Sequence, residues 1–575
     1  MIKRLIQSVR EYKKNALLAP TYVTGEVVLE VIIPLLMSYL IDNGIEKNDM
    51  GYVWACGGLL AVCAVISLLC GVMAGKHASI ASAGFARNLR HDMYYALQDY
   101  SFANIDKFST ASLITRMTTD VMHLQHAFQM IVRITVRSPS MLIFSLIAAF
   151  SVSPRLALIF AAVVPFLGIG LYLIIRYAHP VFLRMFKKYD RLNTVVQENL
   201  RGVRVVKTFV RERHETEKFR ESSEGIYQDS CTAERLMAFN SPLMQISMYT
   251  CILLISWFGA KMVTGNTGLT TGQLMSLFTY VQQILMSLMM ISMILVMITM
   301  SRASAQRVTE VLSEKSTITG GTVTDVTSGE IRFENVTFRY GGVDSRPALN
   351  TIDLHIRSGE TVGIIGGTGS SKSTLVQLIP RLYDISEGAL SVGGVDVREY
   401  DLTTLRDNVA MVLQKNVLFS GTIKENLRWG NPDATDEELV HACKLAQAHD
   451  FVISFPDGYD TLIDQGGANV SGGQKQRLCI ARALLKKPKI LILDDSTSAV
   501  DTRTDALIRK AFREEIPDTT KLIIAQRIAS VQDADKIIVL DGGRISAVGT
   551  HDELLKTSEI YQSVYRSQLK GGEEQ

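Results

Sequence analysis

The sequence predicts two parts of different character, an all-α membrane domain of six helices followed by a soluble α/β domain. The chain has 575 residues, which is too many for a single hydrophobic core. Long charge-free stretches lie in its first half, whereas strand-like runs such as "TVGIIG" and "KILIL" alternate with helical patterns in the second. A polar segment, "EKSTITGGTVTDVTSGE", separates the halves. We therefore expect a transmembrane domain at 1–313, a linker at 314–329 and a soluble domain at 330–575.

Six stretches of the first half are apolar enough to cross a bilayer, which requires about 20 residues of helix. The last of them begins with a loop-like segment, "MVTGNTGLTTGQ", and two neighbouring stretches are separated only by Arg155, which would lie in a tight turn. The six predicted spans are 17–41, 51–75, 138–154, 156–175, 238–260 and 262–301.

The segments between the spans differ in charge. Residues 42–50 are few and acidic, whereas 76–126 and 176–235 are long and basic. Positive charge stays on the cytoplasmic side of a membrane, so we expect both long segments and both chain termini in the cytoplasm. The helical rhythm of "LNTVVQENLRGVRVVKTF" indicates that the spanning helices continue beyond the bilayer. The start, "MIKRLIQSVREYKK", has no cleavage site and resembles a helix lying on the membrane surface.

Charge and cysteine content exclude some classes of function. Lysine plus arginine (60) nearly balance aspartate plus glutamate (57), and the net charge of +3 gives no reason to expect a nucleic-acid partner. The seven cysteines show no metal-binding spacing, so we expect free thiols in a reducing compartment.

The first and last spans contain unusual residues. Glu26 and Glu30 lie one helical turn apart, and carboxylates at membrane depth are costly unless they face a bundle interior or water. One interpretation is that they contact a cationic substrate. The alternative is that they form a satisfied structural pair or face a hydrated vestibule. The last span is rich in methionine, which suits varied apolar ligands but also packs in ordinary cores. The candidate substrate contacts are Glu26, Glu30, Met286, Met290, Met293 and Met297.

The segment "TVGIIGGTGSSKST" matches the phosphate-binding pattern G-x-x-x-x-G-K-[ST] at Gly366, Lys372 and Ser373. A strand ends in Gly366 and a helix opens at Lys372, so backbone N–H groups would cradle phosphates. Lys372 would reach the terminal phosphates, and Ser373 would ligate Mg²⁺. Ser371 replaces the second glycine, and we expect this helix-entry position to tolerate it with altered contacts. The expected ATP contacts are Gly366, Gly367, Thr368, Gly369, Ser370, Ser371, Lys372, Ser373 and Thr374.

Two further motifs complete the nucleotide chemistry. In "LILDDSTSAVD" an apolar strand runs into Asp494, the expected Mg²⁺-side carboxylate, and Asp495. Upstream, "VSGGQKQR" places a serine and two glycines before a helix, which makes a second anion cradle. One domain cannot fold this cradle onto its own P-loop if both lie on its outer face, but two domains facing head to tail could enclose two ATP molecules.

With these motifs the chain closely resembles the ABC exporters, specifically bacterial half-transporters, over essentially its whole length. The resemblance implies a six-helix transmembrane domain of ABC exporter type fused to a P-loop nucleotide-binding domain. It also implies that Tyr340 stacks on adenine and that Gln414 contacts Mg²⁺. Segments near 106–116 and 213–220 would be coupling helices. The signature motif of the family would be Ser471, Gly472, Gly473 and Gln474.

The departures from the family pattern concern hydrolysis. Asp495 stands at the position of the catalytic glutamate and Gln526 at that of the switch histidine. Aspartate is one methylene shorter, and a misplacement of about 1 Å can cost on the order of a hundredfold in rate. Glutamine cannot carry the charge of an imidazolium. We therefore expect a degenerate catalytic site whose signature motif completes the hydrolytic site of a partner chain.

The resulting expectation is one subunit of a heterodimeric, ATP- and Mg²⁺-dependent exporter of amphipathic drugs in a bacterial plasma membrane. Its partners would be a second ABC half-transporter, the lipid bilayer and small amphipathic substrates, with the nucleotide-binding domain in the cytoplasm. Two alternatives remain open at this point. One is a lipid or peptide exporter, and the other is an ATP-gated regulatory or channel-like subunit.

Overall fold

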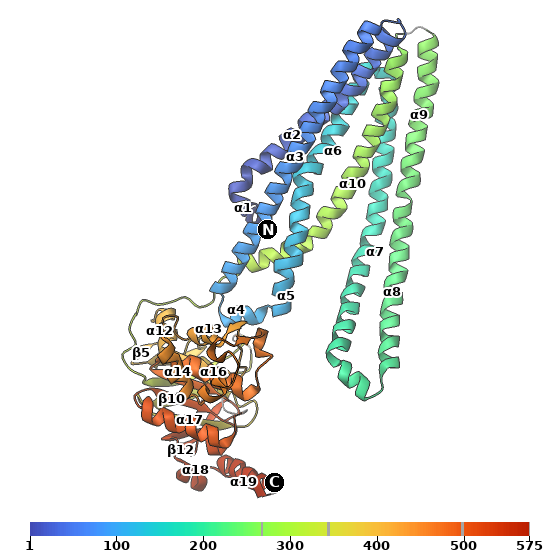
Figure 1. Ribbon diagram of the computed structural model, residues 1–575. Coiled ribbons are helices and arrows are strands. Elements are labelled where there is room, and N and C mark those ends of the chain that lie inside the picture. Colours follow the sequence, from blue (N-terminus) through green and yellow to red (C-terminus); the bar gives the residue numbers. More distant parts are fainter. Residues whose placement is uncertain (266–267, 342–344, 496–499, 574–575) are drawn as a thin grey trace. The chain divides into compact units, whose positions relative to one another are not determined.

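The computed structural model describes residues 1–265, 268–341, 345–495 and 500–573, and it divides into two compact units (Figure 1). The first unit comprises Met1–Gln98 and Ser109–Glu314, and the second comprises Asp99–Phe108 and Lys315–Gln575. The second unit therefore contains not only the soluble half of the chain but also a short segment, 99–108, that interrupts the first unit in sequence.

The first unit is all-α, and six of its described helical segments are long and apolar enough to cross a membrane, as the sequence predicts. One of them, α3, has 50 residues and a length of about 75 Å, more than twice the hydrocarbon core of a bilayer. The helices are α1 (Ile2–Gln7), α2 (Lys13–Tyr39), α3 (Met50–Asp99), α5 (Thr110–Thr115), α6 (Val121–Val152), α7 (Pro154–Thr208), α8 (Glu212–Ala238), α9 (Asn240–Thr264) and α10 (Thr271–Ser313).

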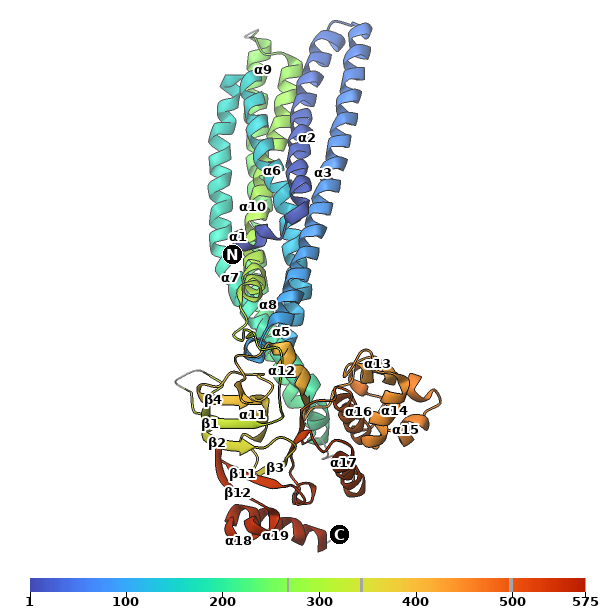
Figure 2. The same cartoon turned by 90° about the vertical axis from the view of Figure 1, so that its left-hand side faces the viewer.

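Helix–helix packing and buried polar contacts order this unit. Helices α2, α6 and α10 pack against one another, and α7 pairs with α8 (Figures 1 and 2). The Asp42 carboxylate accepts hydrogen bonds from the Thr270 hydroxyl (2.6 Å) and the Gly272 amide (2.8 Å), which satisfies the first turn of α10. Near the other end of α10, Arg307 pairs with the buried Asp120, which precedes α6.

The second unit is α/β, which confirms the predicted class of the soluble half. Its larger sheet has the strand order β12-β11-β3-β10-β9-β6, in which β12 alone is antiparallel to its neighbour. A four-stranded antiparallel sheet has the order β2-β1-β4-β5, and β7 pairs with β8. The strands are β1 (Ile331–Phe338), β2 (Leu349–Ile356), β3 (Thr361–Gly366), β4 (Glu387–Val392), β5 (Val395–Asp396), β6 (Val409–Val412), β7 (Gly421–Thr422), β8 (Leu462–Ile463), β9 (Ile490–Asp494), β10 (Thr520–Ile524), β11 (Lys536–Asp541) and β12 (Arg544–Gly549).

Helices α13 to α16 lie together and apart from β1, β2 and β4, whereas α11 lies beside those strands (Figure 2). The helices are α4 (Phe102–Lys107), α11 (Lys372–Gln377), α12 (Leu402–Asn408), α13 (Ile423–Arg428), α14 (Asp436–Leu445), α15 (His449–Ile453), α16 (Gly472–Leu484), α17 (Thr502–Glu515), α18 (His551–Thr557) and α19 (Glu559–Glu573).

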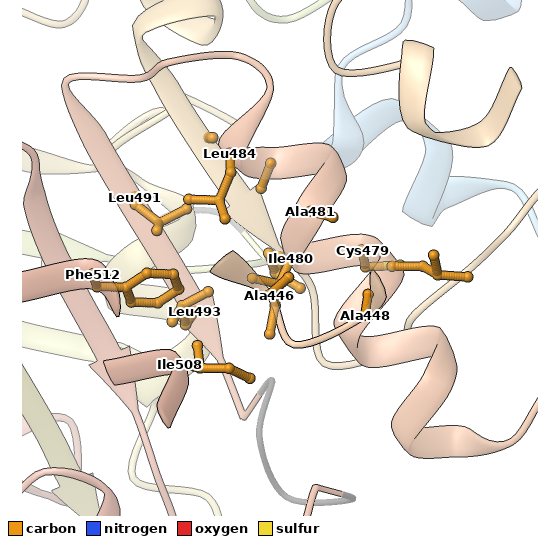
Figure 3. Packing of buried hydrophobic residues seen from close by; sticks show 14 of the residues in the cluster. Ala446, Ala448, Cys479, Ile480, Ala481, Leu484, Leu491, Leu493, Ile508 and Phe512 are labelled. Atoms are coloured by element: carbon orange, nitrogen blue, oxygen red, sulfur yellow. The ribbon is translucent and has the colours of Figure 1, made fainter. Parts of the chain in front are cut away.

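The central strand β9 is buried on both faces, which explains why its sequence reads as a continuous apolar run rather than an alternation. Leu491 and Leu493 face one core, where Ile480 and Leu484 of α16 and Phe512 of α17 pack with them (Figure 3). Ile490 and Ile492 face a second core. Each such side chain contributes about 1.5–3 kcal/mol by burial, so the strand that ends in Asp494 is firmly held.

Candidate functional site

The sheet brings the predicted nucleotide residues to one edge. Strand β10 pairs in parallel with both β3 and β9, so the carboxyl ends of these three strands point the same way. Gly366 ends β3, Asp494 ends β9, and Gln526 follows β10 by two residues. Ligands of open α/β sheets bind at this edge. The topology therefore joins residues that are up to 160 positions apart in the sequence.

The loop after β3 is shaped by close backbone approach. A Cβ at Gly366 would lie 2.2 Å from the Leu540 carbonyl oxygen, so any larger residue is excluded there. The Lys372 ammonium donates to the carbonyl oxygens of Gly366 (2.8 Å) and Gly367 (2.9 Å), and burial lowers its pKa. Thr368, Gly369 and Ser370 complete the turn, with Gly369 at a φ of +82°.

Ser371 has the left-handed backbone that glycine adopts most easily, with φ +69° and ψ +28°. The sequence predicts an ordinary helix entry here, and the structure adds backbone strain. The Ser371 side chain makes no capping hydrogen bond to offset that strain.

We expect Ser371→Gly to raise the stability of the soluble unit by about 1 kcal/mol, because the relief of strain exceeds the added entropy of the unfolded chain. The neighbouring Ser370, whose φ is not positive, provides the matched control, and Ser370→Gly should destabilise. Thermal unfolding of both variants measures the difference. A lower melting temperature for Ser371→Gly would show that the serine is not strained.

Two adjacent carboxylates lie beside this loop. The Ser373 hydroxyl donates to the Asp494 carboxylate at 2.9 Å, and Asp494 is almost fully buried. The Gln526 side-chain amide donates to the Asp495 carboxylate at 2.8 Å, and Gln414 is a second side-chain hydrogen-bond partner of Asp495. Burial raises the pKa of both carboxyl groups. The predicted catalytic pair, Asp495 and Gln526, is thus in direct contact.

The raised pKa of Asp494 makes its charge a cost to the folded protein at neutral pH. The folded state binds a proton at Asp494 more tightly than the unfolded chain does, so protonation of Asp494 stabilises the folded state. This stabilisation is lost as the pH rises through the pKa of Asp494 in the folded protein. Asp494→Asn keeps an acceptor for Ser373 without the charge. We expect a higher melting temperature at pH 7 and a gain that shrinks as the pH is lowered through the raised pKa of Asp494. A variant that melts below the wild type at pH 7 would contradict this.

The predicted adenine contact, Tyr340, is exposed at the end of β1. Its hydroxyl and that of Thr374 form a hydrogen bond of 3.0 Å, and its ring meets that of Tyr383 edge-on at 5.3 Å between centroids. Tyr383 in turn donates to the carboxylate of Asp106, in α4, at 2.7 Å. Sequence reasoning missed Tyr383, which carries no motif and whose partners come from distant segments.

The signature residues occupy the N-terminus of α16. Ser471 caps this helix. Its hydroxyl accepts a hydrogen bond from the backbone N–H of Gln474 (3.3 Å), and the side-chain oxygen of Gln474 accepts one from the backbone N–H of Ser471 (2.9 Å). Gly472 is exposed, so this end of the helix presents N–H groups to an anion. Among the described residues, no hydrogen bond or ion pair joins Ser471, Gly472, Gly473 or Gln474 to the loop 366–374.

The predicted substrate residues of the first unit meet an unpredicted arginine. Arg137 of α6 forms ion pairs with Glu26 (2.6 Å) and Glu30 (2.8 Å), which favours the structural pair over free carboxylates. Beside them is a cavity of about 470 Å³ whose lining includes Glu26, Met286 and Met290. Within the described chain, Glu30, Met293 and Met297 do not line it. The sequence signal that could have revealed this pairing is the presence of two arginines one helical turn apart, at 133 and 137.

Comparisons with known proteins agree with this architecture. Residues 22–307 match the family described as "ABC transporter transmembrane region", and residues 349–498 match the family described as "ABC transporter". An uncharacterized ABC transporter ATP-binding protein of Bacillus subtilis is 36% identical over 569 residues, which cover 99% of each chain. One of Mycobacterium bovis is 34% identical over 575 residues, 99% of this chain and 98% of the relative. The mitochondrial potassium channel ATP-binding subunit of Mus musculus is 34% identical over 95% of this chain and 77% of its own length.

Proposed function

The chain belongs to the ABC transporter family, and from this premise we propose that it is the degenerate-site half of a heterodimeric exporter. As a member of the family it is a multi-pass membrane protein with an ATP-binding domain of ATPase type. The observation that carries the proposal is the 2.8 Å hydrogen bond from the Gln526 amide to the Asp495 carboxylate, at the two positions that hydrolysis depends on.

The residues of the loop and of β9 suit ATP with Mg²⁺. Ser373 and Asp494 place a hydroxyl and a carboxylate oxygen 2.9 Å apart, and oxygen is the ligand type that Mg²⁺ prefers. A Cβ at Gly367 or Gly369 would meet nothing within 4 Å, so the backbone of this loop is open where a phosphate would lie. We propose that Ser373, Asp494 and Gln414 hold Mg²⁺, which would neutralise phosphate charge when bound, and that Lys372 and Tyr340 hold the nucleotide.

Hydrolysis of ATP at this site should be slow. Asp495 has the left-handed φ of +50°, and its carboxylate accepts from the amides of Gln526 and Gln414. A general base must reach the water whose proton it takes, and this carboxylate is both short and held. Gln526 donates a neutral hydrogen bond and brings no positive charge to the phosphates. The site therefore retains nucleotide with slow turnover or none.

The signature motif supports a partner chain. The exposed N-terminus of α16 offers preorganised N–H donors that, within the described part of the chain, have no phosphate-binding loop of their own to face. We propose that Ser471, Gly472, Gly473 and Gln474 complete the hydrolytic site of a second half-transporter. Substrates would be amphipathic drugs or similar lipophilic compounds, since methionines and polar groups share the cavity beside Glu26. The location would be a bacterial plasma membrane with cytoplasmic termini.

A second candidate function has its own support. A relative from Mus musculus bears the name of a potassium channel ATP-binding subunit, and a chain that holds ATP without turnover would suit gating rather than pumping. Reconstitution separates the two candidates. The chain is co-expressed with a second half-transporter and placed in proteoliposomes, and accumulation of an amphipathic dye is followed with ATP and with a non-hydrolysable analogue. Accumulation of the dye against a gradient with ATP, but not with the analogue, supports export. Equilibration without accumulation, under either nucleotide, supports gating and overturns the exporter proposal.

A further inference from the structure

The cavity between α2, α6 and α10 has charge of both signs on its walls. Arg133, Arg137 and Glu26 line it together with polar side chains and three methionines. Its lining residues lie on α2, α6 and α10. The methionines and the remaining polar residues of the lining are Met141, Met286, Met290, Ser138, Thr279, Gln282, Gln283 and Ser287.

The negative side of this cavity is the cluster of Glu26, Glu30 and Arg137. Arg137 pairs with both carboxylates, at 2.6 Å and 2.8 Å, so two negative charges share one positive charge and the cluster has a net charge of −1. Glu26 is held against α3, since a Cβ at Gly71 would lie 3.0 Å from its carboxylate oxygen. The cluster is therefore fixed in place on one wall.

The positive side is Arg133, one helical turn from Arg137 on the same face of α6. Arg133 is half-buried, and no acidic side chain among the described residues forms an ion pair with it. Its guanidinium extends toward α3, where a Cβ at Gly75 would lie 3.8 Å away. Arg133 and the cluster cancel in total charge, and they approach α3 one helical turn apart, at Gly75 and Gly71.

We propose that this cavity selects amphipathic zwitterions, with an anionic group at Arg133, an amine or other cation toward the cluster, and an apolar body against the methionines. The inference rests on the proposed export function and names its substrate class. A simple cation would be attracted by the cluster but repelled by Arg133. A simple anion would be attracted by Arg133 but repelled by the cluster. A zwitterion satisfies both groups without leaving a net charge in an apolar surrounding. Both a free amphipath and a zwitterionic lipid headgroup have this chemistry.

Three dyes that share a xanthene body test the proposal, namely tetramethylrhodamine (a zwitterion), its methyl ester (a cation) and fluorescein (an anion). Binding to the full chain in micelles of the nonionic detergent dodecyl maltoside, which contain no zwitterionic headgroup to compete, is measured by fluorescence anisotropy without ATP, so the result is independent of transport. We expect the zwitterion to bind about tenfold more tightly than either other dye, the range expected of one charge-assisted hydrogen bond. Equal affinities, or no binding of the zwitterion, would overturn the proposal.

Variants identify the responsible groups. Arg133→Gln should weaken binding of the zwitterion about tenfold and improve binding of the methyl ester, because the charge that repels a cation is removed, whereas Arg133→Lys should keep most of the preference. Glu30→Gln, outside the cavity lining, makes the cluster neutral and should improve binding of fluorescein relative to the zwitterion. Arg155→Gln, at an exposed arginine near the start of α7, is the control and should change nothing. Equal weakening of all dyes by Arg133→Gln would mean a structural role and overturn the assignment.

A further arm distinguishes the two sources of zwitterion. Dihexanoyl phosphatidylethanolamine is added to the chain in dodecyl maltoside micelles with bound tetramethylrhodamine. Displacement identifies a lipid headgroup as a natural occupant, and retention identifies a free amphipath. Both results support the chemical class. If the zwitterion binds in an Arg133-dependent way but is not transported in proteoliposomes, the export function is contradicted and the binding proposal is not.

Discussion

Gly472→Asp in the assembled heterodimer is expected to lower substrate-stimulated ATP turnover by roughly 10²–10³-fold, the usual cost of losing one preorganised donor. Gly472 lies at the exposed N-terminus of α16, where an aspartate would add a negative charge opposite the phosphates bound by the partner. Folding should be little changed, because this position is exposed and the cap formed by Ser471 and Gln474 is kept.

The matched control is Asp495→Asn in the same heterodimer. Asp495 belongs to the site that already lacks a glutamate, and its carboxylate is already bonded to Gln526, so its removal should change turnover little. ATPase activity of the two variants is compared at equal expression. If Asp495→Asn abolishes turnover while Gly472→Asp leaves it near wild type, the two sites are assigned the wrong way round.

Restoring the missing groups should produce the second large effect. Asp495→Glu with Gln526→His returns the longer base and a titratable imidazole to the edge of the sheet, and it removes the amide that now holds the carboxylate. With the catalytic glutamate of the partner changed to glutamine, activity from this site alone is measured. We expect a rise on the order of a hundredfold over the same complex without the restoration, since about 1 Å of reach is regained.

The single restorations serve as controls. Asp495→Glu alone should recover part of the rate, and Gln526→His alone should recover less, because the short carboxylate still limits the reaction. A double variant that remains as slow as its parent, while still binding ATP, would show that the site is inactive for a reason other than these two residues.

Much of the fold follows from sequence patterns that depend only on local chemistry. The six spans are visible as charge-free runs, and the strand before Asp494 is visible as an apolar run that is buried on both faces. The phosphate-binding loop is encoded within nine consecutive residues, so its position needs no tertiary information. Each of these features has a physical cause that acts along the chain.

Features that depend on tertiary contact were not visible in the same way. Arg137 pairs with two glutamates that are more than a hundred positions away, and nothing in the local sequence specifies that pairing. Ser371 reads as an ordinary helix entry, because backbone strain depends on φ rather than on residue pattern. The contact of Tyr383 with Asp106 joins the soluble half to a segment between two membrane helices in sequence. Such contacts require the fold.

ATP turnover by the purified wild-type chain without a partner tests the degenerate-site account most directly. The measurement is made with Mg²⁺ and an amphipathic substrate, and a thermal shift with ATP verifies that the nucleotide binds. We expect ATP to stabilise the chain while turnover stays far below that of ordinary enzymes, which is about 1 s⁻¹ or above. Turnover at such ordinary rates would show that Asp495 and Gln526 suffice for hydrolysis and would contradict the account.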